Sequence, residues 1–338
     1  MLFCGPSMLD RATALSAFVT ASGWGDALRA PLAGDASARR YWRLSQGEAK
    51  AVLMDAPPGQ ADDPAAFVRI AGHLRALGLS APEVLAEDLS HGFLLLEDLG
   101  DDLYARVTND PAMEEPLYTA AAEVLAHLQA ARPPEGLPDL SAEDWANAAT
   151  LALDWYAFAA TGSRPEPAPF ITELTEALLR HADGPRVLIL RDYHAENLLW
   201  LPERPGLAKV GLLDFQLAQM GQPAYDLVSL VQDARRDVAP ATAAATVRRF
   251  ADVTGAENLD TAIAVIGAQR GLRILGVFAR LGVQAGKPGY LPLIPRVWGQ
   301  VQANLAHPAL ARVRAVCDDL LPPPTPATLD RIARQCAR

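Results

Sequence analysis

Short runs of apolar and aromatic residues, separated by turn-forming residues, occupy the first third of the chain. Such runs are typical of strands, and they predict four of them, at 40–44, 51–54, 84–85 and 93–96. The first two are separated by Gln46-Gly47 and predict a hairpin. Apolar residues three and four apart predict a helix at 67–77, capped by Gly78, and a further helix is expected at 10–22. This part therefore predicts a small antiparallel-sheet lobe.

Beyond residue 100 the pattern becomes mainly helical, beginning with a helix at 118–131. Two short apolar runs, 187–190 and 210–213, predict strands inside this helical part, and an acidic residue follows each run. The sequence therefore predicts an α+β fold of two lobes, with residues 1–97 in the small lobe and 98–338 in the larger helical lobe.

The composition is that of a folded enzyme: half of the 338 residues are hydrophobic and 21% are charged. A net charge of -10 repels nucleic acid and anionic lipid, so the arginines at 270–280 and 312–338 are interpreted as solvated helix faces. No apolar run approaches the length of a membrane span, and the three cysteines lack CxxC spacing. We expect a cytoplasmic monomer that binds a small molecule, with no nucleic-acid or membrane partner.

The strongest chemical signal is Asp192, followed five residues later by Asn197 and, after the next apolar run, by Asp214. Phosphoryl transfer from ATP needs one carboxylate to accept the proton of the attacking hydroxyl, and oxygen ligands for Mg²⁺. We therefore predict Asp192 as the catalytic base and Asn197 and Asp214 as the magnesium ligands. A hairpin formed by 198–200 and 209–213 would bring the two ligands together.

Two other interpretations of these residues remain open. Any one of the three could be a strand-end cap or a turn residue. Alternatively, Asp192, His194 and Glu196 could form a different metal site, although the spacing matches no recognised zinc centre. We interpret His194 as a histidine that packs within the loop.

The segments 192–198 and 213–215 resemble the signature of the aminoglycoside phosphotransferase and choline kinase group, distant relatives of the protein kinases. The resemblance implies a kinase-like fold with a nucleotide-binding lobe at 1–97 and a catalytic and substrate-binding lobe at 98–338. It also implies that Asp226, in Tyr225-Asp226-Leu227, braces the catalytic loop from the start of a helix.

Four further segments, 34–41, 54–58, 93–100 and 271–281, resemble the bacterial anomeric kinases of N-acetylmuramate and N-acetylglucosamine. This narrower resemblance implies phosphorylation of the sugar's anomeric hydroxyl in cell-wall recycling. Other acceptors of the aminoglycoside, choline or homoserine type remain open, as does a pseudokinase that binds nucleotide without turnover. Five residues are candidates for contact with the acceptor: Trp145, Trp155, Tyr156, Arg273 and Trp298.

The resemblance also assigns nucleotide contacts. It places a turn over the ATP phosphates and a linker whose backbone pairs with adenine; the residues are Gly34, Asp35, Ala36 and Ser37 in the turn, and Glu97 and Leu99 in the linker. One feature departs from the broad group, because Met54 lies where a phosphate-binding lysine is usual. Lys50 lies roughly 13 Å away along the strand. Arginines just upstream could bind the phosphates instead: Arg39, Arg40 or Arg43, of which Arg43 is our candidate.

Overall fold

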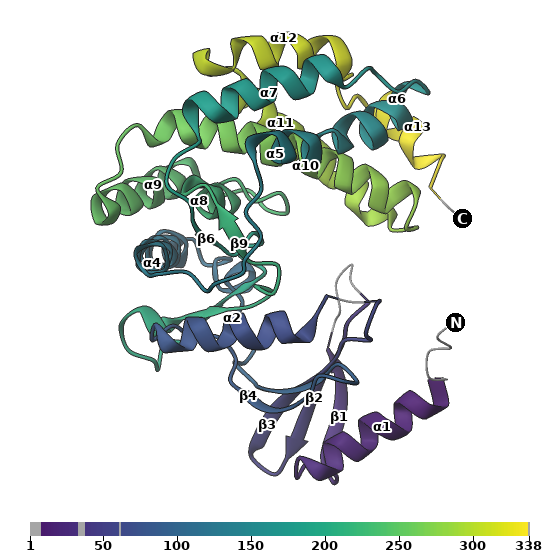
Figure 1. The fold of residues 1–338 in the computed structure, drawn as a ribbon, viewed down its shortest axis with the longest axis vertical. Coiled ribbons are helices and arrows are strands. Elements are labelled where there is room, and N and C mark those ends of the chain that lie inside the picture. The colour runs from purple at the N-terminus through teal and green to yellow at the C-terminus, as the bar shows by residue number, and fades with distance from the viewer. Residues whose placement is uncertain (1–7, 33–37, 61, 337–338) are drawn as a thin grey trace. The chain divides into compact units, whose positions relative to one another are not determined.

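The computed structural model describes residues 8–32, 38–60 and 62–336. The chain forms two compact units, coloured along the sequence in Figure 1. Unit 1 is drawn from residues 1–108 and 196–218, and unit 2 from 109–195 and 219–338. The predicted α+β fold, with an antiparallel sheet near the N-terminus and a mainly helical remainder, is confirmed. The assignment of nucleotide binding to 1–97 and of catalysis to 98–338 stays a prediction.

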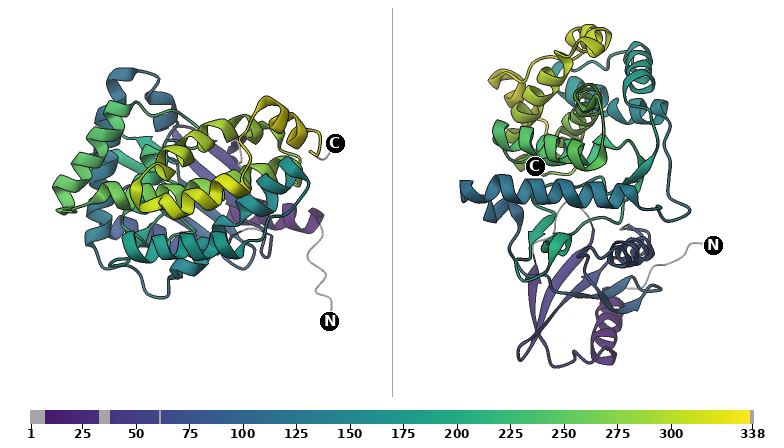
Figure 2. Two further views of the ribbon diagram at one scale, coloured as in Figure 1. Left: turned by 90° about the horizontal axis from the view of Figure 1, so that it is seen from above. Right: turned by 90° about the vertical axis from the view of Figure 1, so that its left-hand side faces the viewer.

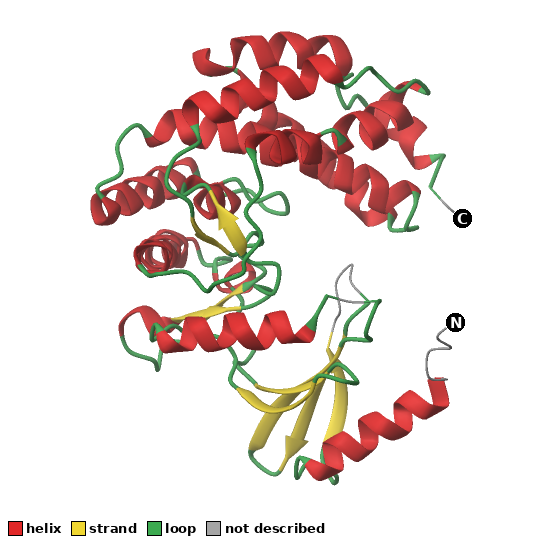
Figure 3. Ribbon diagram, viewed as in Figure 1, coloured by secondary structure: helices red, strands yellow, loops and turns green. Residues whose placement is uncertain are grey.

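Unit 1 is built on a five-stranded sheet of order β1-β2-β3-β5-β4, in which all neighbouring strands are antiparallel (Figure 3). Its helices and strands are α1 (Met8–Ala21), β1 (Leu28–Leu32), β2 (Arg40–Gln46), β3 (Ala49–Asp55), α2 (Pro64–Ala76), β4 (Val84–Asp88), β5 (Phe93–Glu97), α3 (Tyr104–Val107), β7 (Leu198–Trp200), the 3-10 helix η2 (Gly206–Lys209) and β8 (Val210–Leu212). The four strands and two helices predicted here are all present, and Gly78 follows α2 with the positive φ of a helix-ending residue.

One face of this sheet is covered by α1. Leu15 and Val19 of the helix pack with Leu44, Leu53 and Phe93 of the strands in one buried apolar cluster. Burial of these side chains supplies the main stabilisation of a small lobe.

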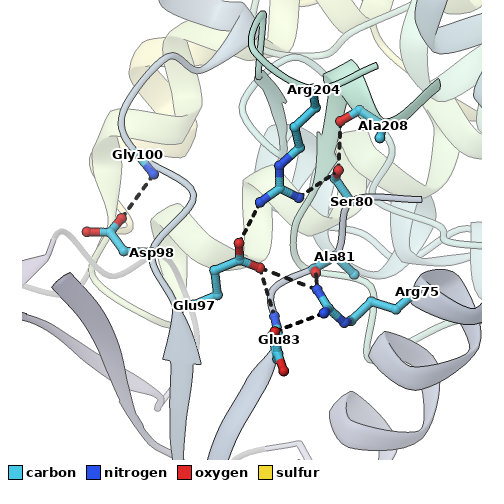
Figure 4. A network of polar contacts seen from close by, with 9 residues as sticks. All are labelled: Arg75, Ser80, Ala81, Glu83, Glu97, Asp98, Gly100, Arg204 and Ala208. Carbon is cyan, nitrogen blue, oxygen red and sulfur yellow. Dashed lines mark hydrogen bonds and ion pairs between the residues drawn. The ribbon is translucent and has the colours of Figure 1, made fainter. Parts of the chain in front are cut away.

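The hairpin of β7 and β8 also belongs to unit 1, although it lies far along the sequence. Leu198 pairs with Leu212 in the antiparallel register. Ser80, before β4, fixes the hairpin: its carbonyl accepts from the Leu212 N–H (2.8 Å), and its hydroxyl donates to the Ala208 carbonyl (2.6 Å). Arg204, in the hairpin loop, donates to the Ser80 hydroxyl (2.8 Å), as Figure 4 shows. The N-terminal part of the chain thus holds this hairpin in place.

Unit 2 is mainly helical, with one two-stranded sheet of β6 and β9. Its elements are α4 (Pro111–Ala130), α5 (Ala142–Ala149), the π-helix η1 (Ala152–Ala157), α6 (Phe158–Thr161), α7 (Ala168–His181), β6 (Val187–Ile189), β9 (Gln219–Gly221), α8 (Ala224–Val231), α9 (Pro240–Thr254), α10 (Leu259–Val283), the 3-10 helix η3 (Pro288–Leu293), α11 (Ile294–Leu305), the 3-10 helix η4 (Pro308–Leu310), α12 (Ala311–Leu320) and α13 (Pro326–Ala333). The right-hand view of Figure 2 shows α4 lengthwise as one continuous helix.

The long helix α10 forms the centre of this unit. By length and composition it could cross a membrane, although Arg270 and Arg273 interrupt its apolar sequence, so no uninterrupted apolar run reaches that length. However, most of this apolar part of the helix is buried within the structure. Its apolar side chains, among them Leu272 and Leu275, pack in the large cluster shared with α5, α7 and α11. The apolar surface of α10 is therefore used in packing between helices.

A test of this packing is available at Gly276 in α10. A Cβ atom added there would lie 2.1 Å from the Leu151 carbonyl carbon, a contact that requires backbone movement. Overpacking of this kind destabilises by about 1–3 kcal/mol or more. We expect Gly276→Ala to lower the melting temperature by roughly 5 °C or more. The matched control is Gly299→Ala in α11, where a Cβ meets no atom of the described residues within 4 Å. Because alanine favours helix, this control should melt at or above the wild-type temperature, and equal melting of both variants would contradict the packing argument.

Candidate active site

The loop that carries Asp192 begins directly after β6 and is held by a buried carboxylate. Asp226, in the first turn of α8, is 0% exposed and accepts hydrogen bonds from the Leu190 N–H (2.6 Å) and the Arg191 N–H (2.9 Å). Burial raises the pKa of Asp226 to about 7, and the two backbone bonds oppose that rise. The role that the resemblance implied for Asp226, bracing the catalytic loop, is what this geometry provides.

Two further anchors, which the sequence did not indicate, hold the same loop. Asp233 is buried and accepts a hydrogen bond from the backbone N–H of Ala195. The hydroxyl of Tyr193 donates to the carbonyl of Ala121 in α4 (2.9 Å). The loop is therefore fixed at its start, middle and end from three elements of unit 2.

The residue before Asp192 has an unusual backbone conformation. Arg191 has a φ of 74°, in the left-handed region that residues other than glycine seldom adopt. Such strain costs on the order of 1–3 kcal/mol and persists where surrounding contacts impose it, commonly at functional sites. Here the bond from the Arg191 N–H to Asp226 is one such contact. Asp192 itself is half-buried.

The two predicted magnesium ligands lie at the ends of the β7–β8 hairpin in unit 1. The Leu213 N–H donates to the Asn197 carbonyl (2.9 Å), so the chain brings Asn197 beside the residue that precedes Asp214. The hairpin predicted from the sequence is confirmed. Asp214 is half-buried and has a left-handed φ of 56°. One carboxylate and one amide oxygen are donors that suit Mg²⁺, which retains water and takes phosphate oxygens for its other positions. The residues present therefore fit this ion.

A buried arginine lies against the Asp214 carboxylate. The Arg39 guanidinium is 2.7 Å from Asp214 Oδ1 and 3.7 Å from Asp62, and its side chain is only 8% exposed. The side-chain amide of Gln216 donates to the same Oδ1 (3.0 Å). Arg39 is thus the candidate among the upstream arginines that the structure places beside a predicted metal ligand.

Arg43, our sequence-based candidate for the phosphates, has other partners. Its guanidinium pairs with Asp98 (2.6 Å) and with Asp101 (2.7 Å), just after β5. These bonds raise the pKa of Arg43 and lower that of Asp101. Arg43 therefore fixes the segment that follows Glu97, and its contact with phosphate stays a prediction.

The remaining nucleotide candidates stay predictions as well. Gly34, Asp35, Ala36 and Ser37 lie outside the described residues. The side chain of Glu97 pairs with Arg204 and Arg75 and accepts from the Glu83 N–H (3.2 Å), in the network of Figure 4. Leu99 is half-buried in the segment after β5. Glu97 is thus structural through its side chain, and contact of its backbone with adenine stays a prediction.

The alternative metal site of Asp192, His194 and Glu196 is wrong. These three residues are described, and no group of three His, Cys, Asp or Glu side chains suited to a metal occurs among the described residues. His194 is 3% exposed, and its Nε2 lies 3.1 Å from the Arg235 guanidinium. Burial, together with Arg235 and Arg270, lowers the pKa of His194 well below its usual value. The interpretation of His194 as a packing residue agrees with this environment.

The aromatic candidates for the acceptor take part in packing. Trp145 and Tyr156 are buried in the core of unit 2, and the Tyr156 hydroxyl donates to the Pro322 carbonyl (2.6 Å). Trp155 and Trp298 are partly buried against the same core. Arg273 is the candidate among the five whose side chain is charged and could bind a charged group of the acceptor.

The arginines at the centre of α10 do not form a solvated face. Arg270 is 6% exposed and donates to the Ser229 hydroxyl (2.7 Å), and Arg273 is half-buried one turn further along. The expectation of a solvated face is therefore wrong for these two residues, because α10 is a core helix.

Known proteins resemble this chain over most of its length. Residues 29–260 match the model of the family described as "Phosphotransferase enzyme family". The chain is 40% identical to the N-acetylmuramate/N-acetylglucosamine kinase of Caulobacter vibrioides, over 93% of this chain and 97% of that protein. It is 35% identical to the protein of the same name from Pseudomonas aeruginosa, over 87% and 89%. These matches confirm the family resemblance stated from the motifs.

Solved structures share the fold at low identity. A putative aminoglycoside phosphotransferase from Ralstonia eutropha has a TM-score of 0.63 and 18% identity, over 90% of this chain and 98% of that one. A thermostable mutant of aminoglycoside phosphotransferase APH(4)-Ia, in ternary complex with AMP-PNP and hygromycin B, has a TM-score of 0.61 and 16% identity, over 87% and 100%. At these identities the likeness concerns the fold alone, and it confirms the kinase-like architecture.

Proposed function

Because the chain belongs to the phosphotransferase enzyme family, we propose that it transfers the γ-phosphoryl group of ATP to the anomeric hydroxyl of N-acetylmuramate and N-acetylglucosamine. The prediction of a small-molecule kinase is confirmed by the family and by the named kinases that share up to 40% of its residues. The anomeric position, the cytoplasm as compartment and the recycling of cell-wall sugars belong to the proposal.

The observation that carries the proposal is the construction of the loop and hairpin around three residues. Asp192 follows the strained residue Arg191, on a loop whose backbone N–H groups donate to Asp226. Asn197 and Asp214 lie just before the first strand and just after the second strand of one hairpin. A kinase catalyses mainly by positioning its groups, with little covalent chemistry of its own. Firm placement of Asp192 within unit 2, and of Asn197 and Asp214 within unit 1, therefore suits the proposed reaction.

In the proposed mechanism Asp192 orients the anomeric hydroxyl and accepts its proton as the oxygen bonds to the γ-phosphorus and ADP departs. Asn197 and Asp214 would hold Mg²⁺ through their side-chain oxygens. The ion, when bound, neutralises charge on the phosphates. Asp226 keeps Asp192 in position, and Arg39 offers a guanidinium suited to a phosphate in place of the missing lysine.

The choice of acceptor rests on the names of the relatives. The Caulobacter and Pseudomonas proteins are named for two amino sugars, and they match this chain over most of their length. The other acceptors, and a pseudokinase that binds nucleotide without turnover, make different predictions in the same assay.

The test is release of ADP from magnesium-ATP in the presence of N-acetylmuramate, N-acetylglucosamine, kanamycin, choline or homoserine. We expect release with the two amino sugars alone and an acid-labile sugar 1-phosphate as the product. Turnover of another acceptor in their place would identify a different kinase. Binding of ATP without turnover of any acceptor would instead favour the pseudokinase.

A further inference from the structure

A pair of arginines projects from α10 toward the start of the catalytic loop. Arg270 and Arg273 are three residues apart and thus share one face of the helix, which packs on α8. Arg270 donates to the Ser229 hydroxyl (2.7 Å), and that hydroxyl donates in turn to the Arg191 carbonyl (3.5 Å). This face of α10 therefore lies beside Arg191 and Asp192, within unit 2.

The two arginines differ in how directly their charges are paired. Arg270 has Ser229 as a partner and lies within electrostatic reach of Asp226 and Asp233. Arg273 forms no hydrogen bond or ion pair with any residue that the structure describes, although the negative charge of Asp192 acts to raise its pKa. A half-buried guanidinium in this position is expensive unless an anion accompanies it.

Arg191 adds a second donor without a partner. Its Nε atom is buried and has no hydrogen-bond partner among the described residues. Burial lowers the pKa of Arg273, and Arg191 and Arg270 add to that effect, while Tyr225 and Asp192 oppose it. An arginine stays charged under such an influence, so both guanidinium groups keep their positive charge.

Two anions are possible in a kinase, the phosphates of the nucleotide and a charged group on the acceptor. Arg273, Arg191 and the predicted base Asp192 all lie in unit 2, whereas Arg39 and Asp214 lie in unit 1. Arg273 forms no ion pair with Asp192, although the charges of the two side chains interact. Asp192 would accept the proton of the acceptor's hydroxyl, so the acceptor would bind close to this residue. A charged group on the acceptor is therefore a better candidate for contact with Arg273 than the phosphates of the nucleotide are.

We propose that Arg273, together with Arg191, binds the carboxylate of an acidic acceptor and so favours N-acetylmuramate over N-acetylglucosamine. The inference rests on the proposed function and names a specificity residue for it. The two sugars differ by the lactyl ether of N-acetylmuramate, whose carboxylate a planar guanidinium can bind through two parallel hydrogen bonds. This carboxylate lies several bonds from the anomeric oxygen, which agrees with a guanidinium whose charge interacts with Asp192 without an ion pair between them.

The mutational test is Arg273→Gln, which removes the charge and keeps a polar side chain. We expect kcat/KM for N-acetylmuramate to fall roughly 10- to 100-fold, as for loss of a charged hydrogen bond, while the value for N-acetylglucosamine changes less than about threefold. Arg273→Lys should recover part of the loss because it restores the charge. The matched control is Arg280→Gln, about two turns further along the same helix, which should leave both values unchanged.

Other results would overturn the assignment in distinguishable ways. An equal loss for both sugars would make Arg273 a positioning residue for the loop, and a raised KM for ATP would assign it to the phosphates. Either result would leave the proposed function intact. If the unaltered enzyme used neither sugar, the proposed function itself would fail, and this inference with it.

A second test needs no variant and so does not depend on how Arg273→Gln folds. The unaltered enzyme is given N-acetylmuramate and its lactyl amide, in which the carboxylate is replaced by a neutral group of the same shape. We expect kcat/KM of the unaltered enzyme to be lower for the amide than for N-acetylmuramate, by a factor similar to the loss that Arg273→Gln causes with N-acetylmuramate. Equal use of the acid and the amide would refute the proposal.

Discussion

Asp192→Asn should lower kcat by about 10³-fold while ATP binding stays nearly unchanged. Asparagine has the shape of aspartate but cannot accept the proton of the sugar hydroxyl. The loop should keep its conformation, because its backbone N–H groups donate to Asp226 and the hydroxyl of its Tyr193 donates to the Ala121 carbonyl. The candidate residues for the nucleotide are elsewhere in the sequence, in unit 1. The measurement is steady-state release of ADP, with ATP affinity determined separately by calorimetry.

Glu196→Gln is the matched control for this variant. Glu196 is an exposed acid four residues after Asp192, and it belonged to the alternative metal set that the structure contradicts. We expect its kcat to stay within a factor of about three of the wild-type value, as for most surface substitutions. An Asp192→Asn enzyme with normal kcat would remove Asp192 from the mechanism, and equal losses in the two variants would point to a general disturbance of the loop.

The sheet of unit 1 could largely be predicted because most of its strands carry apolar runs between turn residues. The strand β1 could not be predicted, since Leu28–Leu32 has almost no buried side chain and Leu28 is 78% exposed. It forms by backbone pairing with β2, which leaves no apolar pattern in the sequence. The pairing of β6 with β9 was missed for a related reason, because three-residue strands are too short to show a period.

In the candidate site, features that depend on neighbouring residues could be predicted, whereas contacts between residues far apart in the sequence could not. The spacing of Asp192 and Asn197 is local, and a pattern of residue types reveals it. The support that Asp233 gives the loop and the contact of Arg39 with Asp214 join residues distant in sequence, so only the folded chain shows them.

The arginines of α10 illustrate a different limit of sequence interpretation. Charged residues in a helix usually face solvent, and that base expectation led to the wrong environment for Arg270. The signal that could have corrected it is the apolar character of the rest of the helix, which leaves no face for solvent. Arg270 instead donates to the Ser229 hydroxyl, which donates in turn to the Arg191 carbonyl of the catalytic loop.

Asp214→Asn should raise the concentration of magnesium needed for half-maximal rate and lower kcat by about 10²-fold or more, if Asp214 is a metal ligand. Asparagine suits this position better than alanine does, because it tolerates the left-handed φ of 56°. The variant therefore removes the charge without adding backbone strain. Loss of the carboxylate also removes the ion pair of Asp214 with Arg39, so the metal effect must be separated from that of the ion pair.

Asp62→Asn separates the two effects, because Asp62 is the second carboxylate beside Arg39, at 3.7 Å, and is not a predicted ligand. We expect Asp62→Asn to change the magnesium dependence little, whereas Asp214→Asn shifts it to higher concentration, since a ligand without charge holds a divalent ion less strongly. The measurement is kcat as a function of free magnesium at fixed ATP. Identical magnesium curves for wild type and Asp214→Asn would refute the ligand role. A shift of equal size in both variants would instead mean that Arg39, through its ion pairs, governs the response to the metal.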